Sequence, residues 1–250
     1  MKRLFVVVIV FFITLFNTYN IKHLVSEKLG NLLPSQIAEA ILKKDEIKPK
    51  NIKPAVKEKQ LLDVPLINQM AEPHLKNGCE VTSLAMILNY YGKKVTKNEL
   101  AKRIKKVPLH YPHNLKGNPN IGFVGDMADG PGLSVYNGPI FDLAKQYMGD
   151  KVINLTNRPF ERILEKVSLG MPVWVITTMN FKDDVKFRKW DTPQGTIYIT
   201  FSGHSVVITG YDKNYIYVND PYGYKNRKVS RKDFIDAWSV MGKQAIAIES

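Results

Sequence analysis

The sequence has very little cysteine: Cys79 is the only one among 250 residues. A single thiol excludes an internal disulfide framework and every zinc or iron–sulfur site that needs several cysteines. The chain also lacks a glycine-rich phosphate loop and an internal repeat. If Cys79 has a chemical role, it acts as a free thiol, and we expect no cofactor and no metal ion.

Negative charge is scarce as well, since 36 lysine and arginine residues against 23 aspartate and glutamate residues give a formal net charge of +13. Such an excess draws a protein to anionic surfaces, which include nucleic acid, phospholipid headgroups and cell wall. The tyrosines fit core and strand packing better than a stacking platform for bases, and much of the excess lysine lies in one segment. We therefore expect an anionic membrane or cell-wall surface as a partner, and no nucleic acid.

The chain begins with two basic residues and an apolar run. Lys2 and Arg3 precede thirteen residues, 4–16, that are all apolar except Thr14. This pattern is typical of an export signal, although it is shorter than the roughly 20 residues of a membrane-spanning helix. Residues 1–20 are predicted to be either a cleaved signal peptide or an uncleaved signal anchor. Both place the rest of the chain outside the cytoplasmic membrane.

A lysine-rich segment follows. Residues 43–59 hold seven lysines, three acidic residues and two prolines, a composition typical of a solvated tether. We therefore predict a tether over residues 21–60. The periodic, aromatic-rich sequence of residues 61–250 has the length of one domain.

Within this domain, helical patterns precede most strand patterns. Val81, Leu84, Ala85 and Leu88 recur at helical spacing. Further helices are expected at 96–104, 140–147, 160–167 and from Ser230 to Trp238, and strands at 61–65, 173–177, 196–201, 205–211, 215–220 and 244–249. Residues 105–139, with six glycines and five prolines, are expected to form one long loop. This order indicates an α+β fold, with N-terminal helices packed on a C-terminal antiparallel sheet.

Cys79 directly follows Gly78 at the start of the first predicted helix. There the unpaired N–H groups and the positive end of the helix dipole favour a thiolate. The alternative is a small buried hydrophobic side chain, which is the commonest fate of a free cysteine. Gln69, which precedes the same helix, could donate a hydrogen bond to an oxyanion.

His204 and Asp220 lie in a predicted hairpin, at the start of one strand and the end of the next. With a three-residue turn, Tyr211 would face Tyr215, and the histidine and aspartate would share the buried face as diagonal neighbours. A two-residue turn would send them to opposite faces. A core histidine and a turn-forming aspartate are alternatives for each alone, but with Cys79 they supply a nucleophile, a base and an orienting acid. Asn219, on the opposite face, is the alternative orienter.

Two further groups of residues have less specific patterns. His110 and His113 lie near Asp126 and Asp129 in the sequence and could suggest a metal site, but no helix aligns them. The three tryptophans fit a substrate cleft and a filled core equally; they are Trp174, Trp190 and Trp238.

Several segments, in order, resemble a known family. They are Asp63-Val64-Pro65, Ile67-Asn68-Gln69, Asn77-Gly78-Cys79-Glu80, Ala85-Met86-Ile87-Leu88, Gly117-Asn118-Pro119-Asn120, Gly122-Phe123-Val124-Gly125-Asp126, Gly170-Met171-Pro172-Val173, Gly203-His204-Ser205-Val206-Val207, Gly210-Tyr211-Asp212 and Asn219-Asp220-Pro221. Together they resemble the stand-alone exported C39-like branch of the papain-like cysteine peptidases, which is related to the double-glycine leader peptidases of bacteriocin exporters. The resemblance covers residues 61 to about 248.

The resemblance implies a papain-like fold and a role for each site residue. Cys79 would be the nucleophile, His204 the general base, Asp220 the orienter and Gln69 the oxyanion donor. Cleavage after a double glycine is not carried over, because the sequence shows no transporter or ATPase segment.

The expected function is that of an exported, thiol-dependent hydrolase that cleaves peptide or related amide bonds through an acyl-enzyme. The substrate would be a peptide or a peptidoglycan-related molecule, and the protein a monomer. Two alternatives remain, a non-catalytic cell-surface binding module on the same fold and a cell-wall amidase or acyl transferase.

Overall fold

The structure is a computed structural model that describes residues 56–249. The predicted signal segment, residues 1–20, and nearly all of the predicted tether, residues 21–60, lie outside this part of the chain. Among residues 56–249, no helix is both long and apolar enough to cross a lipid bilayer.

One antiparallel sheet of seven strands forms the centre of the domain. Its order is β10-β9-β8-β5-β11-β4, and β1 pairs with β8 beside this path. The strands are β1 (Gln60–Leu61), β4 (Val152–Asn154), β5 (Val173–Thr178), β8 (Gly203–Tyr211), β9 (Tyr215–Asp220), β10 (Tyr224–Ser230) and β11 (Ala245–Ile248). All six residues of β5 are buried, as expected for a central strand that is covered on both faces.

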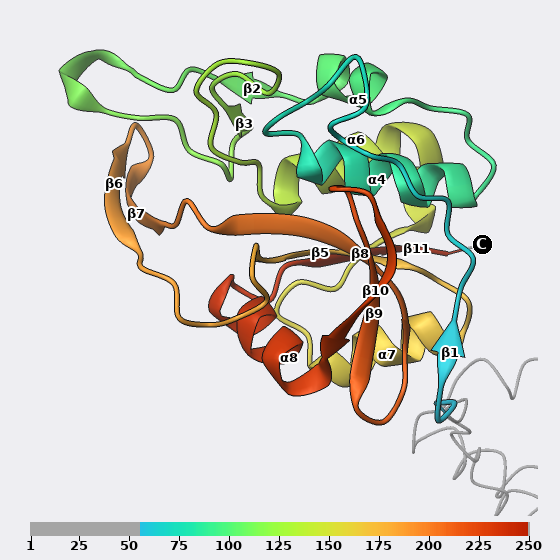
Figure 1. Cartoon of the computed structure of the whole chain (residues 1–250). Coiled ribbons are helices and arrows are strands. Elements are labelled where there is room, and N and C mark those ends of the chain that lie inside the picture. Colours follow the sequence, from blue (N-terminus) through green and yellow to red (C-terminus); the bar gives the residue numbers. More distant parts are fainter. Residues whose placement is uncertain (1–55, 250) are drawn as a thin grey trace, which may run out of the picture. The chain divides into compact units, whose positions relative to one another are not determined.

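Helices cover both faces of this sheet (Figure 1). Those on one side are α4 (Cys79–Tyr90), α5 (Lys97–Arg103) and α6 (Asn137–Met148), and those on the other are α7 (Phe160–Ser168) and α8 (Arg231–Val240). The predicted α+β fold is therefore confirmed. The earlier helices pack on the later strands as expected, and α7 and α8 complete the second layer.

Helix α4 carries Cys79 at its first position. Every residue from Glu80 to Leu88 is buried, so the helix is enclosed on nearly all sides, including those beyond the predicted apolar stripe. It packs on β5 and β8 and against α5 and α6. Cys79 therefore begins a helix that is packed on several sides by the core.

Outside the predicted loop at 105–139, three strands were not predicted, namely β4, β6 (Arg188–Thr192) and β10. β10 lies at one edge of the main sheet, while β6 forms a separate two-stranded sheet with β7 (Gly195–Ile199). β6 and β10 are rich in charged and polar residues because much of their surface is exposed, and this hides the strand pattern. The predicted strand at 61–65 shortens to β1.

The predicted loop at 105–139 is mostly irregular, as expected, but it contains two short parallel strands. These are β2 (Lys106–Val107) and β3 (Phe123–Val124). The 3₁₀ turn η1 (Pro112–Asn114) lies within the segment, and a second 3₁₀ turn, η2 (Gly149–Lys151), follows α6. The backbone N–H of Lys116 donates to the carbonyl of Asp191 at 2.9 Å, which ties the loop to the β6–β7 hairpin. The long segment is thus part of the folded domain.

The three tryptophans fill the core rather than line an open cleft. All are buried, and each indole N–H donates to a backbone carbonyl: Trp174 to Glu80 at 3.0 Å, Trp190 to Gly117 at 2.8 Å and Trp238 to Gln244 at 3.0 Å. Buried indoles normally find such a partner. The bond from Trp174 fixes the backbone next to Cys79.

The folded domain begins earlier than the predicted boundary at residue 61. The N–H of Lys57 donates to the Ser168 hydroxyl at 2.9 Å, and the hydroxyl of Tyr211 donates to the Lys57 carbonyl at 2.8 Å. Gln60 pairs with Tyr211 in the sheet. Lys57 and Gln60, which the sequence places in the tether, are therefore joined to the folded domain by these contacts.

Candidate active site

Cys79 begins helix α4 directly after Gly78, which caps the helix. A side chain at position 78 would be impossible, because its Cβ would lie 2.6 Å from the Cβ of Leu75. The glycine carbonyl accepts the hydroxyl of Thr82 at 2.7 Å, which closes the first turn. The Cys79 side chain is thus placed at the N-terminus of the helix, as predicted, and its residue is partly exposed.

His204 and Asp220 form a hydrogen-bonded pair beside the end of β9. Nε2 of His204 lies 2.9 Å from Oδ1 of Asp220, and both side chains are almost fully buried. Because the carboxylate accepts the proton on Nε2, the neutral ring leaves Nδ1 unprotonated and able to accept another proton. The two residues that the sequence assigned to base and orienter are therefore in direct contact.

The hairpin reaches this arrangement by a different register from the predicted one. Tyr211 pairs with Ile216, not with Tyr215, so the turn is longer than expected. Continued without interruption, that register would place Asp220 and His204 on opposite faces. An irregularity between Ile208 and Gly210 adds one residue to β8 and restores the expected pairing.

The residue in this bulge, Thr209, is held by its own hydroxyl. Its Oγ1 lies 3.2 Å from the carbonyl of Tyr217 and 2.8 Å from Oδ1 of Asn226. Beyond the bulge, Val207 pairs with Asn219 as the predicted register requires. The predicted pairing of Tyr211 with Tyr215 is therefore wrong, but His204 and Asp220 do lie on the same face of the sheet, as predicted.

Asp220 is held as a carboxylate by three donors. Besides the His204 ring, Oδ1 accepts the N–H of Tyr222 at 3.1 Å, and Oδ2 accepts Nη1 of Arg227 at 2.8 Å. Burial by itself raises the pKa of Asp220, but the hydrogen bonds from His204, Tyr222 and Arg227 outweigh it and hold the pKa below its ordinary value. A charged Asp220 stabilises a protonated His204.

The Cys79 thiol lies near the pair formed by His204 and Asp220. It is within hydrogen-bonding reach of the backbone N–H of Ser205, the residue after His204. Ser83, one turn along α4, donates its hydroxyl to the Ser205 carbonyl at 3.1 Å, which fixes the helix against β8. Tyr222 stacks on the His204 ring at 5.1 Å between ring centroids and is close enough to Cys79 to be affected by its charge.

The electrostatics of the thiol differ from the prediction. Burial raises the pKa of Cys79 well above its ordinary value, and the neighbouring Glu80 carboxylate raises it further. The N–H of Ser205 lowers the pKa but does not compensate. The helix N-terminus favours a thiolate, as expected, but burial and Glu80 act in the opposite direction and raise the pKa, so we expect Cys79 to give its proton to a base when it reacts.

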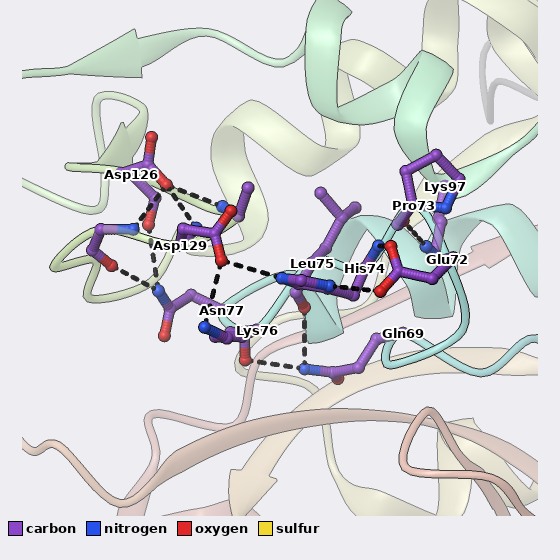
Figure 2. A network of polar contacts seen from close by, with 12 residues as sticks. Gln69, Glu72, Pro73, His74, Leu75, Lys76, Asn77, Lys97, Asp126 and Asp129 are labelled. Atoms are coloured by element: carbon purple, nitrogen blue, oxygen red, sulfur yellow. Dashed lines mark hydrogen bonds and ion pairs between the residues drawn. The ribbon is translucent and has the colours of Figure 1, made fainter.

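Gln69 is buried near the same site, but its amide serves the chain itself (Figure 2). Nε2 donates to the carbonyls of Leu75 at 3.1 Å and Lys76 at 2.9 Å, which uses both of its hydrogens. A flipped amide would turn its oxygen towards two carbonyl oxygens, so the hydrogen bonds fix the orientation. In this arrangement Gln69 has no N–H left for an oxyanion, contrary to the predicted role.

Gln69 nevertheless connects the two halves of the site. Its backbone N–H donates to the carbonyl of Pro221 at 2.7 Å, next to Asp220, while its side chain holds the loop that leads into Cys79. Asn219, the alternative orienter, is also used elsewhere: its Nδ2 donates to the carbonyl of Val64 at 2.9 Å. Both amides therefore brace the site.

One stretch of the long loop flanks the start of α4. Oδ1 of Asp129 lies 2.9 Å from His74 Nε2 and 3.1 Å from Lys76 Nζ, and Asn77 Nδ2 donates to the carbonyl of Asp126 at 3.0 Å (Figure 2). These contacts tie the loop to the segment that leads into Cys79, and the Cys79 residue is partly exposed.

The metal site that the histidines and aspartates of the long loop could suggest is not formed by these side chains. Asp126 Oδ1 accepts three backbone N–H groups of its own loop, and Asp129 pairs with His74 and Lys76 rather than with His110 or His113. In residues 56–249, no group of three or more histidine, cysteine, aspartate or glutamate side chains is placed to hold a metal ion.

Three residues of the site were missed from the sequence. Tyr222 and Arg227 follow Asp220 and contact the histidine–aspartate pair, and Glu80 follows Cys79 with its carboxyl buried beside the thiol. Proximity in sequence to a predicted site residue was the available signal for Tyr222 and Glu80. An acidic residue in the first turn of a helix is usually explained by the helix dipole, which concealed Glu80.

Comparison with known proteins gives a family match that spans the site. The model of the Peptidase_C39 like family matches residues 61–246, which include Cys79, His204 and Asp220. The uncharacterized protein YvpB of Bacillus subtilis (strain 168) is 58% identical over 188 residues, which are 75% of this chain and 75% of that protein.

Solved structures give a matching fold. A crystal structure described as a "putative C39-like peptidase from Bacillus anthracis" has a TM-score of 0.74 and 42% sequence identity, and the match covers 78% of this chain and 98% of that one. Xylellain, a cysteine protease from Xylella fastidiosa, is 12% identical with a TM-score of 0.43, over 80% of this chain and 89% of that one.

Proposed function

Since the chain belongs to the Peptidase_C39 like family, as its motifs predict, we propose that it is a cysteine peptidase that hydrolyses peptide or closely related amide bonds. One observation carries the proposal: Cys79, a partly exposed residue at a helix N-terminus, lies beside β8, the strand of His204, and the ring of His204 pairs with Asp220 at the end of β9. Nucleophile, base and orienter in this relation are the parts of an acyl-enzyme mechanism. The triad is Cys79, His204 and Asp220.

The acylation step uses Nδ1 of His204 as the base. The ring takes the thiol proton while Sγ of Cys79 attacks the substrate carbonyl carbon, and Asp220 stabilises the imidazolium that forms. The imidazolium then gives its proton to the amine as the C–N bond breaks, which leaves a thioester. In deacylation the ring takes a proton from a water molecule, whose oxygen attacks the thioester carbonyl. The C–S bond then breaks, the carboxylic acid leaves, and the ring returns the proton to the sulfur.

The developing oxyanion has a donor in the backbone of the nucleophile. The N–H of Cys79 is at the first position of α4, where no intrahelical carbonyl can accept it. Such an N–H, aligned with the helix dipole, stabilises a negative charge on the substrate oxygen. A second donor would come from Gln69 only if substrate binding released its amide from Leu75 or Lys76.

The test is hydrolysis by the purified full chain. A library of fluorogenic peptides and a peptidoglycan-derived muropeptide mixture are incubated with the protein and with a Cys79→Ser variant. We expect cleavage that is lost in the variant, and a mass increase on Cys79 when an acyl-enzyme is trapped by acid quenching. Binding of a ligand without cleavage, equal in both proteins, would instead identify a binding module.

The site of action is the second part of the proposal. We infer that residues 1–20 direct export and that the lysines of residues 43–59 hold the domain near an anionic membrane or wall surface. In a bacterial host, the domain should be digested by protease added to spheroplasts, and salt should weaken its attachment after cleavage of the first 20 residues. A domain protected from added protease would contradict export.

A further inference from the structure

Glu80 is a buried acid that the mechanism above does not use. It follows the nucleophile in α4, and only 2% of its residue surface is exposed. Within the described part of the chain, no lysine, arginine or histidine forms an ion pair with it, and only neutral groups donate to its oxygens. Burial of a carboxylate without a cation is costly, so a site of this kind favours the neutral acid.

The two carboxyl oxygens of Glu80 have different surroundings. Oε1 accepts the hydroxyl of Ser134 at 2.5 Å and the backbone N–H of Val135 at 3.2 Å. Oε2 is buried and has no hydrogen-bond partner among residues 56–249. The Cys79 thiol belongs to the preceding residue, and the thiol and the Glu80 carboxyl each shift the pKa of the other. Oε2 is therefore the oxygen that is free to carry a proton towards the sulfur, while Oε1 keeps both of its donors.

We propose that Glu80 acts as a neutral carboxylic acid that donates a hydrogen bond from Oε2 to the Cys79 sulfur and so favours the thiolate. The proton of Glu80 stays on Glu80, and the thiol proton goes to Nδ1 of His204. The catalytic consequence rests on the proposed function, whereas the effect on the thiol itself does not.

The charge state of Glu80 decides whether it raises or lowers the pKa of Cys79. An ionised Glu80 accepts a hydrogen bond from the thiol and repels the thiolate, and both effects raise the pKa of Cys79. A neutral Glu80 removes the repulsion and reverses the direction of the hydrogen bond. Burial raises the pKa of Glu80, which extends the pH range in which the neutral acid persists.

The other titratable groups near Glu80 do not change this argument. Tyr136 comes from the segment before α6 and Tyr222 from the turn after β9, and burial raises the pKa of both phenols, that of Tyr136 to about 12. They stay neutral while Glu80 titrates. His204 stacks on Tyr222 and is the group that receives the thiol proton. Ionisation of Glu80 should therefore raise the pKa of Cys79, so that reactivity rises less steeply with pH than it would beside a neutral side chain.

The experiment compares full-length wild type with three variants. Glu80→Gln keeps a neutral side chain that can donate to sulfur and accept from Ser134 and Val135, and Glu80→Ala removes both functions. Glu161→Gln is the matched control, because Glu161 is an exposed glutamate in the first turn of α7. The rate of Cys79 alkylation by iodoacetamide is measured against pH, because it follows the thiolate fraction and needs no substrate.

We expect Glu80→Gln to keep alkylation within about threefold of wild type at acidic pH and to exceed wild type at alkaline pH, where wild type carries the carboxylate. Glu80→Ala should fall about tenfold or more below wild type at acidic pH, since the thiolate loses a donor. Glu161→Gln should match wild type. If Glu80→Gln reacts as slowly as Glu80→Ala at acidic pH, or has the same alkaline profile as wild type, the proposal is wrong.

Peptide hydrolysis by the same proteins separates the two proposals. If alkylation behaves as expected but no protein cleaves any substrate, the role of Glu80 stands and the peptidase activity is refuted. If hydrolysis depends on Cys79 while Glu80→Gln shows the alkylation profile of wild type, the activity stands and the role of Glu80 is refuted. Circular dichroism of each variant verifies the fold, and Glu80→Gln decides the result if Glu80→Ala is unfolded.

Discussion

Nε2 of His204 lies 2.9 Å from Oδ1 of Asp220 because a bulge in β8 corrects a register that would otherwise separate them. The turn of the hairpin pairs Tyr211 with Ile216, and one extra residue at Thr209 returns the strands to a pairing in which both side chains share a face. In the proposed mechanism, Nδ1 of this ring accepts the proton from Cys79. The catalytic proposal depends on this one irregularity.

Replacement of Asp220 should impair turnover more than folding. Asp220→Asn removes the negative charge that stabilises the protonated ring of His204, so kcat should fall by about 10²–10⁴, and His204→Ala should abolish measurable turnover. The measurement is kcat/KM on a cleaved peptide together with urea unfolding. As a control, Asn219→Ala should lower stability with little effect on kcat of the folded protein. The reverse result would make Asn219 the orienter.

Gln69 should behave as a brace of the loop before Cys79. Gln69→Ala leaves the carbonyls of Leu75 and Lys76 without their buried donor, so the free energy of unfolding should fall by about 1–3 kcal/mol. An oxyanion donor would show a different pattern, a loss of about 10²–10³ in kcat with an unchanged unfolding midpoint. Urea unfolding and steady-state kinetics on the same preparation distinguish the two roles.

Cys79 should be alkylated slowly at mildly acidic pH. Because burial raises its pKa, iodoacetamide should modify it more slowly than it modifies free cysteine at about pH 6. The rate is measured by mass spectrometry of the intact chain, in which Cys79 is the only cysteine. Cys79→Ser gives the background. Modification faster than that of free cysteine would show a resting thiolate.

His74 should titrate above its ordinary pKa of 6.5, because the hydrogen bonds that its ring donates to the carboxylates of Glu72 and Asp129 raise the pKa. A raised histidine pKa stabilises the folded state fully below 6.5, and this contribution is lost as pH rises through the folded pKa. NMR titration of the imidazole should show the shift, and Asp129→Asn should reduce it. An unshifted His74 in wild type would contradict the contact that joins the loop to the start of α4.

Two truncations test where the domain begins. A chain that starts at Val56 keeps Lys57 and β1 and should unfold like the full-length domain. Removal of residues 1–61 deletes β1 and leaves the Tyr211 hydroxyl without its acceptor, so the free energy of unfolding should fall by about 1–3 kcal/mol. Urea midpoints of the two proteins provide the comparison. Equal midpoints would restore the predicted boundary at residue 61.

The sequence by itself determined the main elements and three of the site residues. The apolar period after Gly78 places Cys79 at the start of a buried helix, and alternating residues around His204 and Asp220 define a hairpin whose ends meet. These patterns are local, so spacing along the chain is enough to detect them. Edge strands such as β10 were not predicted, because exposed strands carry polar residues that hide the strand pattern.

Only the tertiary structure decided how the site residues interact. The burial of Glu80 depends on contacts with a segment distant in sequence. The bulge at Thr209 and the binding of the Gln69 amide by two nearby carbonyls depend on the path that the backbone takes in the folded chain. Hydrogen-bond partners and pKa shifts arise from packing, which residue spacing does not encode. The sequence thus supplied the reactive groups, and the fold determined the direction of their hydrogen bonds and the charge that each one favours.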